Sequence, residues 1–186
     1  METQTATPKL TLDDILLLFK ETDRKMQETD EQMKKTDKKI NQMSESIGRL
    51  GNRLGEFVEE MVRPAAVRLF KERGIEVHEV HQNISSQRNG EGIEIDLLVV
   101  NDSDIIAIEC KSNLKIDDIR EHLKRLEKLK RLLPAYANKR VMGAVSAMVL
   151  AENVVQYAYN QGLYVIAQTG EHLTVCNDVE FKAKTW

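Results

Sequence analysis

Two carboxylates, Asp96 and Glu109, fall within apolar, β-branched runs on either side of the four-residue segment 101–104. Such runs around a short turn predict two antiparallel strands joined by a tight loop. If Val100 faces Ile105, the same register sets Asp96 directly opposite Glu109. Opposed residues have Cβ atoms roughly 4.5 to 5.5 Å apart, and like charges placed there destabilise a sheet. Some other group must therefore offset the repulsion between these two carboxylates.

A divalent cation would offset the repulsion between Asp96 and Glu109. Mg²⁺ takes oxygen ligands from one or two carboxylates, keeps several waters and binds substrate phosphate in its remaining positions. Lys111 follows Glu109 by two residues and so points to the same side of its strand. An ammonium there can orient or deprotonate a water, or stabilise negative charge that develops on a phosphate. These residues predict phosphate chemistry with Mg²⁺ or Mn²⁺ as the cofactor.

Alternation of side chains along the two strands predicts that the other face of the hairpin packs in the core. Its members are Ile93, Ile95, Leu97 and Val99 on the first strand and Ile106, Ile108, Cys110 and Ser112 on the second. An alternative without a metal stays open, in which Glu94 forms an ion pair with Lys111. Asp96 and Glu109 would then lie on a solvated strand face. That alternative does not explain why two carboxylates share a site beside apolar neighbours.

Asp96, a turn and Glu109-Cys110-Lys111 together resemble the Asp…(Asp/Glu)-X-Lys signature of the PD-(D/E)XK nuclease superfamily. That superfamily includes restriction enzymes, Holliday-junction resolvases and RecB-like nucleases. Ile95 stands where the motif name has proline, a departure that many members share. Residues 56–64 and 143–168 look most like an uncharacterised bacterial group that is fused to coiled coils.

The resemblance implies an α/β fold with a restriction-endonuclease-like mixed sheet flanked by helices. A helix precedes the motif hairpin in that family, and a strand-helix-strand unit follows it. The implied function is a metal-dependent endonuclease that hydrolyses phosphodiester bonds, with DNA as the expected substrate. Asp96, Glu109 and the Cys110 carbonyl would hold the ion, while Lys111 assists the nucleophile or the transition state. The alternative function is a catalytically silent scaffold that binds nucleic acid or a protein partner.

Related nucleases often place one more acid on the helix before the hairpin. The sequence offers Glu56, Glu59 and Glu60 there, and Glu56 and Glu60 share a helix face at i and i+4. We favour Glu60, then Glu56, as the residue that supports the metal site. Each of the three is also compatible with an ordinary solvated helix glutamate.

The first third of the chain repeats an apolar pattern every seven residues, as the a and d positions of a coiled coil do. The a positions are Met26, Met33, Ile40, Ile47, Leu54 and Met61, and the d positions are Thr29, Thr36, Met43, Leu50 and Phe57. Lys25 and Asp30 add a g-to-e′ spacing that allows an ion pair between chains. The alternative is a single amphipathic helix that lies on its own domain. A helix over 14–62 would run roughly 70 Å, longer than a small domain is wide, so we expect a homo-oligomer, with a parallel dimer favoured.

Length and composition are consistent with one catalytic domain and an appendage. We expect a disordered N-terminus at 1–13, a coiled-coil oligomerisation helix at 14–55, a nuclease-like domain at 56–180 and a tail at 181–186. The two cysteines, without a secretory signal, predict a reducing cytoplasm as the compartment. No apolar run approaches the roughly 20 residues that a membrane span needs, so no membrane association is expected.

Positive charge for nucleic acid is concentrated in two regions. The loop that we expect at 81–92 contains Arg88, and residues 115–140 hold nine Lys or Arg against four Asp or Glu. We nominate Arg88, Lys115, Arg120 and Lys124 as phosphate-binding residues. A plain surface turn and an ordinary solubilising helix face remain the alternatives. The net charge of −3 argues against strong nonspecific binding at physiological salt.

Overall fold

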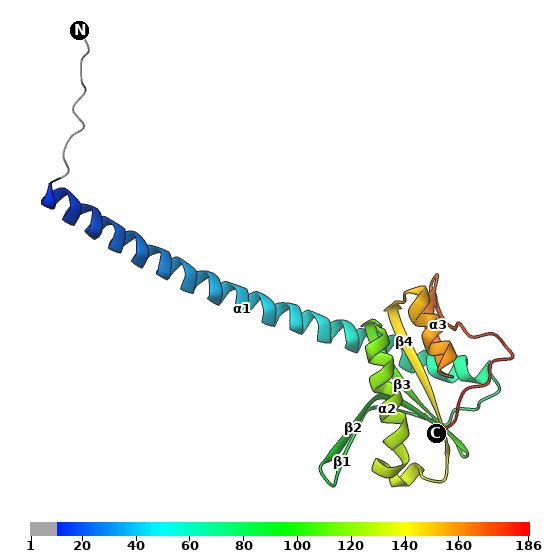
Figure 1. Cartoon of the computed structure of the whole chain (residues 1–186). Helices are drawn as coiled ribbons and strands as arrows, with labels where there is room; N and C mark the ends of the chain where they lie inside the picture. Colours follow the sequence, from blue (N-terminus) through cyan, green and yellow to red (C-terminus); the bar gives the residue numbers. More distant parts are fainter. Residues whose placement is uncertain (1–10) are drawn as a thin grey trace. The chain divides into compact units, whose positions relative to one another are not determined.

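The computed structural model describes residues 11–186, and the first ten residues, which make up most of the expected disordered N-terminus at 1–13, lie outside the described part. The elements are α1 (Leu12–Lys71), β1 (Glu79–Arg88), β2 (Glu91–Val100), β3 (Asp104–Asn113), α2 (Ile116–Leu132), the 3-10 helix η1 (Pro134–Tyr136), β4 (Arg140–Val149), α3 (Glu152–Asn160), β5 (Tyr164–Thr169) and β6 (His172–Val175). A long helix followed by a mixed sheet with flanking helices confirms the predicted α/β fold (Figure 1). Among residues 11–186, no helix is both long and apolar enough to cross a bilayer.

Helix α1 begins at Leu12 because Thr11 caps it. The Thr11 amide donates to Asp14 Oδ2 (2.9 Å), and the Asp14 amide donates to Thr11 Oγ1 (3.3 Å), which is a reciprocal capping box. The helix continues through Pro64. It ends before Gly74, whose φ of +74° is a backbone conformation that favours glycine.

The chain divides into two compact units, Met1–Arg49 and Leu50–Trp186. In the described part of the first unit, residues 11–49, every side chain is exposed, including those at the heptad a and d positions. Within residues 11–186, side chains are exposed up to Leu54, and the first partly buried residue is Gly55. The helix is unbroken across the glycines at 48, 51 and 55, and a Cβ added at any of them would meet no atom within 4 Å.

The second unit is built on a six-stranded sheet in the order β1-β2-β3-β4-β5-β6. Strands β3, β4 and β5 are parallel to one another, whereas the pairs β1–β2, β2–β3 and β5–β6 are antiparallel. The end of α1, from Val58 to Phe70, packs on one face of the sheet, and α2 and α3 pack on the other. A helix, an antiparallel hairpin and a strand-helix-strand unit therefore follow one another in the predicted order.

The hairpin has the predicted register, since Val100 pairs with Ile105. Its ladder extends only to Leu97 and Ile108, beyond which β2 pairs with β1 alone and β3 with β4 alone. The predicted single core face of β2 is wrong. Ile93 and Ile95 pack on the α2 side of the sheet, whereas Leu97 and Val99 pack on the α1 side. The alternation shifts at Asp96, beside Asn83 of β1, which has a φ of +51°.

Two other segments differ from expectation. The loop expected at 81–92 is instead the β1–β2 hairpin, and Arg88 is the last residue of β1. Its turn is Asn89-Gly90, both with positive φ, which is a strong hairpin signal in a sequence. Residues 181–186, where we expected a tail, contact the two cores through Phe181 and Trp186. The Trp186 amide also donates to the Val141 carbonyl (3.0 Å).

Candidate active site

The site forms where β2 and β3 separate. At this point the Cys110 amide donates to Asp96 Oδ2 (2.7 Å), so a carboxylate takes the place of a cross-strand backbone acceptor. Asp96 is thereby held against the strand that carries Glu109 and Lys111. The same hydrogen bond, from the Cys110 amide to Asp96, therefore interrupts the β2–β3 ladder and fixes the carboxylate.

Glu109 is almost completely buried, with 1% of its side chain exposed, and it is held by two cations. Arg125 of α2 binds it in a bidentate manner, from Nη1 to Oε2 (2.5 Å) and from Nη2 to Oε1 (3.1 Å). Lys111 Nζ also approaches Oε1, at 2.9 Å. Burial raises the pKa of Glu109, but the charge of Arg125 and the hydrogen bond from Lys111 lower it further, so this pKa lies below its ordinary value. Lys111 thus pairs with Glu109 and not with Glu94.

His122 lies behind Glu109 and is fully buried. Its Nε2 is 3.1 Å from the Ala107 carbonyl, an acceptor, so this nitrogen carries the proton and Nδ1 carries the lone pair. Among the residues that the structure describes, Nδ1 finds no hydrogen-bond partner, and it lies 3.8 Å from Glu109 Oε2. Burial lowers the pKa of His122 to about 4, so the ring is neutral at physiological pH. His122 therefore contributes no charge to the site.

For two other carboxylates, Asp96 and Glu59, nearby cations do not outweigh burial, and the pKa is raised. Burial, followed by the charge of Glu109, raises the pKa of Asp96. Burial also raises the pKa of Glu59, and the charges of Asp96 and then Glu56 add to this shift. Like charges in a partly dry site favour either a proton or a cation. Asp96 and Glu59 are therefore the oxygens with the strongest electrostatic preference for a positive ligand.

These side chains line an open cavity of about 450 Å³. Glu56 and Glu59 enter it from α1, Asp96 from β2, and Cys110 and Lys111 from β3. The lining residues of α1 include Asn52, Gly55, Glu56 and Glu59, which are spaced i, i+3, i+4 and i+7 and so occupy one helix face. The sequence contains that spacing, and it would have selected Glu59 together with Glu56.

Glu60, the residue that we favoured on this helix, is oriented differently. Its side chain is exposed, forms an ion pair with Arg63 (2.9 Å) and accepts a hydrogen bond from Gln82 (3.1 Å). Of the nominated residues, Asp96, Cys110, Lys111 and Glu56 line the cavity, and Glu109 contacts Lys111. Of the three candidate acids on α1, Glu59 lines it beside Glu56. Arg125 and His122 were not anticipated from the sequence. His122 is at helical spacing from the apolar stripe of α2, and that spacing is a usable signal of burial.

The donor atoms in the cavity suit a hard divalent cation. Asp96 and Glu59 offer carboxylate oxygens, which Mg²⁺ and Mn²⁺ prefer. Within residues 11–186, no three His, Cys, Asp or Glu side chains converge as a ready-made metal cage. Mg²⁺ typically uses only one or two carboxylates and keeps several waters, so the residues fit this ion. Burial raises the pKa of the Cys110 thiol, so Cys110 can offer its carbonyl oxygen but not a thiolate.

The nominated phosphate-binding residues are all exposed. Arg120 forms an ion pair with Asp117 (2.9 Å) and lies over the ring of Tyr157, whereas Arg88, Lys115 and Lys124 are simply exposed. Several other basic residues between 115 and 140 bind within the protein. They are Arg125, Lys128, Arg131, Lys139 and Arg140. Much of the positive charge in this stretch therefore stabilises the fold.

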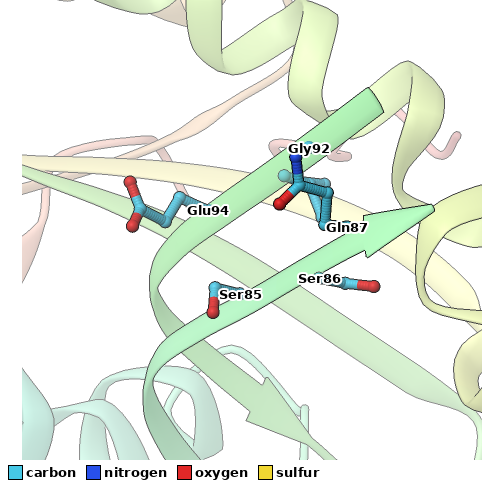
Figure 2. A pocket seen from close by; sticks show the side chains of 6 residues that line it. Ser85, Ser86, Gln87, Gly92 and Glu94 are labelled. Carbon is cyan, nitrogen blue, oxygen red and sulfur yellow. The ribbon is translucent and has the colours of Figure 1, made fainter. Parts of the chain in front are cut away.

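A second cavity, of about 520 Å³, lies along the β1–β2 hairpin. Figure 2 shows Ser85 and Glu94 on neighbouring strands, with Gln87 and Gly92 farther along the hairpin. Of the lining residues within 11–186, Glu94 alone has an ionisable side chain. The lining lacks the paired carboxylates and lysine of the first cavity, so we assign the chemistry to the first.

Comparisons with known proteins give two family matches. A model described as a domain of unknown function (DUF8196) matches residues 59–175, and one described as a protein of unknown function (DUF3782) matches residues 18–91. No curated protein matches the chain.

Two solved structures are similar to the chain. The crystal structure of the protein of unknown function AF1548 is 19% identical, with a TM-score of 0.39, and the match covers 55% of this chain and 54% of that one. The structure of Can2 from Sulfobacillus thermosulfidooxidans in complex with cyclic tetra-adenylate is 16% identical, with a TM-score of 0.42, and the match covers 62% of this chain and 32% of that one. The chain therefore spans about half the length of the first protein and about a third of the second.

Proposed function

We propose that this chain, which belongs to the family described as a domain of unknown function (DUF8196), is a metal-dependent nuclease that hydrolyses phosphodiester bonds. The observation that carries the proposal is the grouping of Asp96, Glu109 and Lys111 where β2 and β3 separate. Asp96 and Lys111 line a cavity there together with Glu59. DNA as the substrate class comes from the resemblance to PD-(D/E)XK nucleases.

The carboxylates would hold the ion. When bound, Mg²⁺ or Mn²⁺ would supply Lewis-acid activation of the attacking water and of the phosphate. Asp96 is suited to this role because the Cys110 amide fixes one of its oxygens, which orients the carboxylate without neutralising it. Glu59 supports the site from α1, and the Cys110 carbonyl is the third oxygen that we assign to it.

Lys111 acts on the phosphate as a cation. Burial lowers the pKa of Lys111, but the hydrogen bond and charge of Glu109 raise it further, so this pKa lies above its ordinary value. An ammonium that is protonated at neutral pH does not accept the proton of an attacking water. Of the two roles open to Lys111, we therefore propose the stabilisation of negative charge on the phosphate in the transition state.

The proposal is tested by cleavage of single-stranded, duplex and branched DNA with Mg²⁺ or Mn²⁺. We expect metal-dependent cutting by the wild type and its loss in both Lys111→Ala and Asp96→Asn. Lys182→Ala, a surface change away from the cavity, is the control and should cut normally. Cutting that persists in folded Lys111→Ala and Asp96→Asn would refute the assignment of this site.

We further propose that the nuclease acts as a homo-oligomer, with a parallel dimer favoured, through the heptads of α1. The described a and d residues between Met26 and Phe57 are exposed on a single chain, as an unpaired coiled-coil seam would be. Replacing Ile40 and Met43 by Asp together should give monomers in light scattering. The same substitutions at the outward positions Lys38 and Gln42 should leave the oligomer intact. A monomeric wild type would overturn this part of the proposal.

One observation favours a second candidate, the catalytically silent scaffold. Both oxygens of Glu109 are already occupied by protein donors, which leaves little room on this residue for a metal ion. A scaffold would bind DNA or a protein partner without cutting, and Lys111→Ala would alter neither oligomeric state nor fold. Binding of DNA by a wild type that never cleaves any of the three substrates would favour this reading.

A further inference from the structure

Arg125 occupies the oxygens of Glu109 that a metal ion would need. Its guanidinium contacts both carboxylate oxygens, and its side chain is only 18% exposed. With Lys111 on Oε1 as well, a single buried carboxylate faces two cations. A carboxylate offers about four lone-pair sites, and three of them are used here. A divalent ion on Glu109 would therefore have to share it with two positive groups, at close range and in a dry environment.

The chemistry of the guanidinium shows how this conflict can be relieved. Arginine binds planar oxyanions, carboxylate or phosphate, through the same pair of parallel N–H bonds. Arg125 also lies close to the separated strands, where its Nη1 is 3.3 Å from the Glu94 carbonyl. A substrate phosphodiester that binds beside Lys111 would be an alternative partner with the same geometry. If the guanidinium moves to it, Glu109 is exposed to an ion.

Resting on the proposed nuclease function, we propose that Arg125 is a positioning residue that blocks Glu109 until a substrate phosphate draws it away. Metal ion and nucleic acid then favour each other's binding. The phosphate takes the Arg125 cation away from Glu109, which favours the metal ion, and the metal ion offsets the negative charge of the carboxylates, which favours the phosphate. Linkage requires the effect to be reciprocal, so DNA raises the affinity for the ion by the same factor as the ion raises the affinity for DNA. Without substrate, the ion is held mainly by Asp96 and Glu59.

The test measures Mn²⁺ binding by calorimetry in the absence of DNA, on the full chain. Arg125→Gln should bind Mn²⁺ about tenfold more tightly than the wild type, which is within the usual range of coupling factors. The same variant should cleave DNA more slowly despite its tighter ion binding. Arg125→Lys keeps the charge but not the fork, and should bind Mn²⁺ with an affinity close to that of the wild type.

Arg140→Gln is the matched control. Arg140 makes the same bidentate contact with Asp104 at the far end of β3, so its loss should leave Mn²⁺ affinity and cleavage unchanged. Equal Mn²⁺ affinity in the wild type and folded Arg125→Gln would overturn the inference, provided that Asp96→Asn weakens binding in both. Mn²⁺ binding that is insensitive to Asp96→Asn, together with no cleavage, would instead overturn the proposed function. Circular dichroism verifies that each variant is folded.

Discussion

Strand β3 carries two buried carboxylates, one at its first residue and one in its second half, and an arginine binds each of them with two hydrogen bonds. Arg140 binds Asp104, at 2.6 and 2.9 Å, and Arg125 binds Glu109. We refer to these two regions as the two ends of the strand. The surroundings of the two pairs are different. Asp104 is otherwise contacted by neutral Ser103, whereas Glu109 also meets Lys111.

The difference separates a structural ion pair from a candidate catalytic one. The Asp104–Arg140 pair joins the first residue of β3 to the first residue of β4, and its charges cancel. Near Glu109 more charged groups meet than a single ion pair contains. Lys111 is a second cation beside Arg125, and Asp96 adds a partly buried negative charge. Groups whose pKa values are shifted by burial and by specific neighbours gather at functional sites. The number of charged groups that meet at one place, and not the ion pair itself, distinguishes this end of the strand.

Isosteric neutralisation at the two ends should give the largest contrast. We expect Glu109→Gln to lower the rate of DNA cleavage by about three orders of magnitude, because it removes a carboxylate of the site and the partner of Lys111. Asp104→Asn should leave the rate within about twofold, since it touches only the structural pair. The measurement is kcat with Mg²⁺ for both variants beside the wild type. Comparable losses of rate in the two variants would remove the distinction between the ends.

A second contrast tests how far the catalytic end extends onto α1. We expect Glu59→Gln to reduce cleavage by about ten- to a hundredfold, within the range seen when a residue that supports a metal is lost. Glu60→Gln should have little effect, because Glu60 is exposed and paired with Arg63. A larger loss in Glu60→Gln than in Glu59→Gln would return the role to Glu60, the residue first favoured from the sequence.

The prediction of the catalytic end depended on features that are local in sequence. The turn at 101–104 sets the register, and that register predicts that Asp96 lies near Glu109 and Lys111. The register could not predict where the β2–β3 ladder stops, because the ladder stops where the side chain of Asp96 competes for the Cys110 amide. The predicted face of β2 failed for the same local reason.

The partners of Glu109 and the neighbour of Asp96 required the tertiary structure. Arg125 is one of nine basic residues in its stretch, and only the packing of α2 on the sheet selects it. Glu59 was passed over because the i, i+4 relation favoured Glu56 and Glu60, although the buried face of α1 decides which acid enters the cavity. Strand β1 is an edge strand with mainly polar residues, so hydrophobic alternation gave it little signal.

Stability should also separate the two ends, with the larger loss at the end that carries Glu109. Arg125→Gln leaves Glu109 buried with only Lys111 as a cation, and we expect a loss of about 3 kcal/mol in the free energy of unfolding. Arg140→Gln should cost clearly less, because the Arg140 side chain is 69% exposed and its charge is screened by water. Urea unfolding at neutral pH measures both values. Equal losses would mean that burial does not distinguish the pairs.

The smallest expected effect is the response of the structural end to acid. Burial raises the pKa of Asp104, but the hydrogen bonds from Arg140 and Ser103 lower it further, so the folded pKa lies below the ordinary value of 3.8. Between these two values the unfolded chain binds the proton and the folded chain does not. The contribution of Asp104 is therefore complete above pH 3.8 and is lost as the pH falls through the folded pKa. Asp104→Asn lacks this contribution at every pH, so its deficit in urea midpoint relative to the wild type should shrink from pH 5 to pH 3. A deficit that stays constant over this range would show that Asp104 is not ionised preferentially in the folded state, and the charge balance assigned to that end of β3 would be wrong.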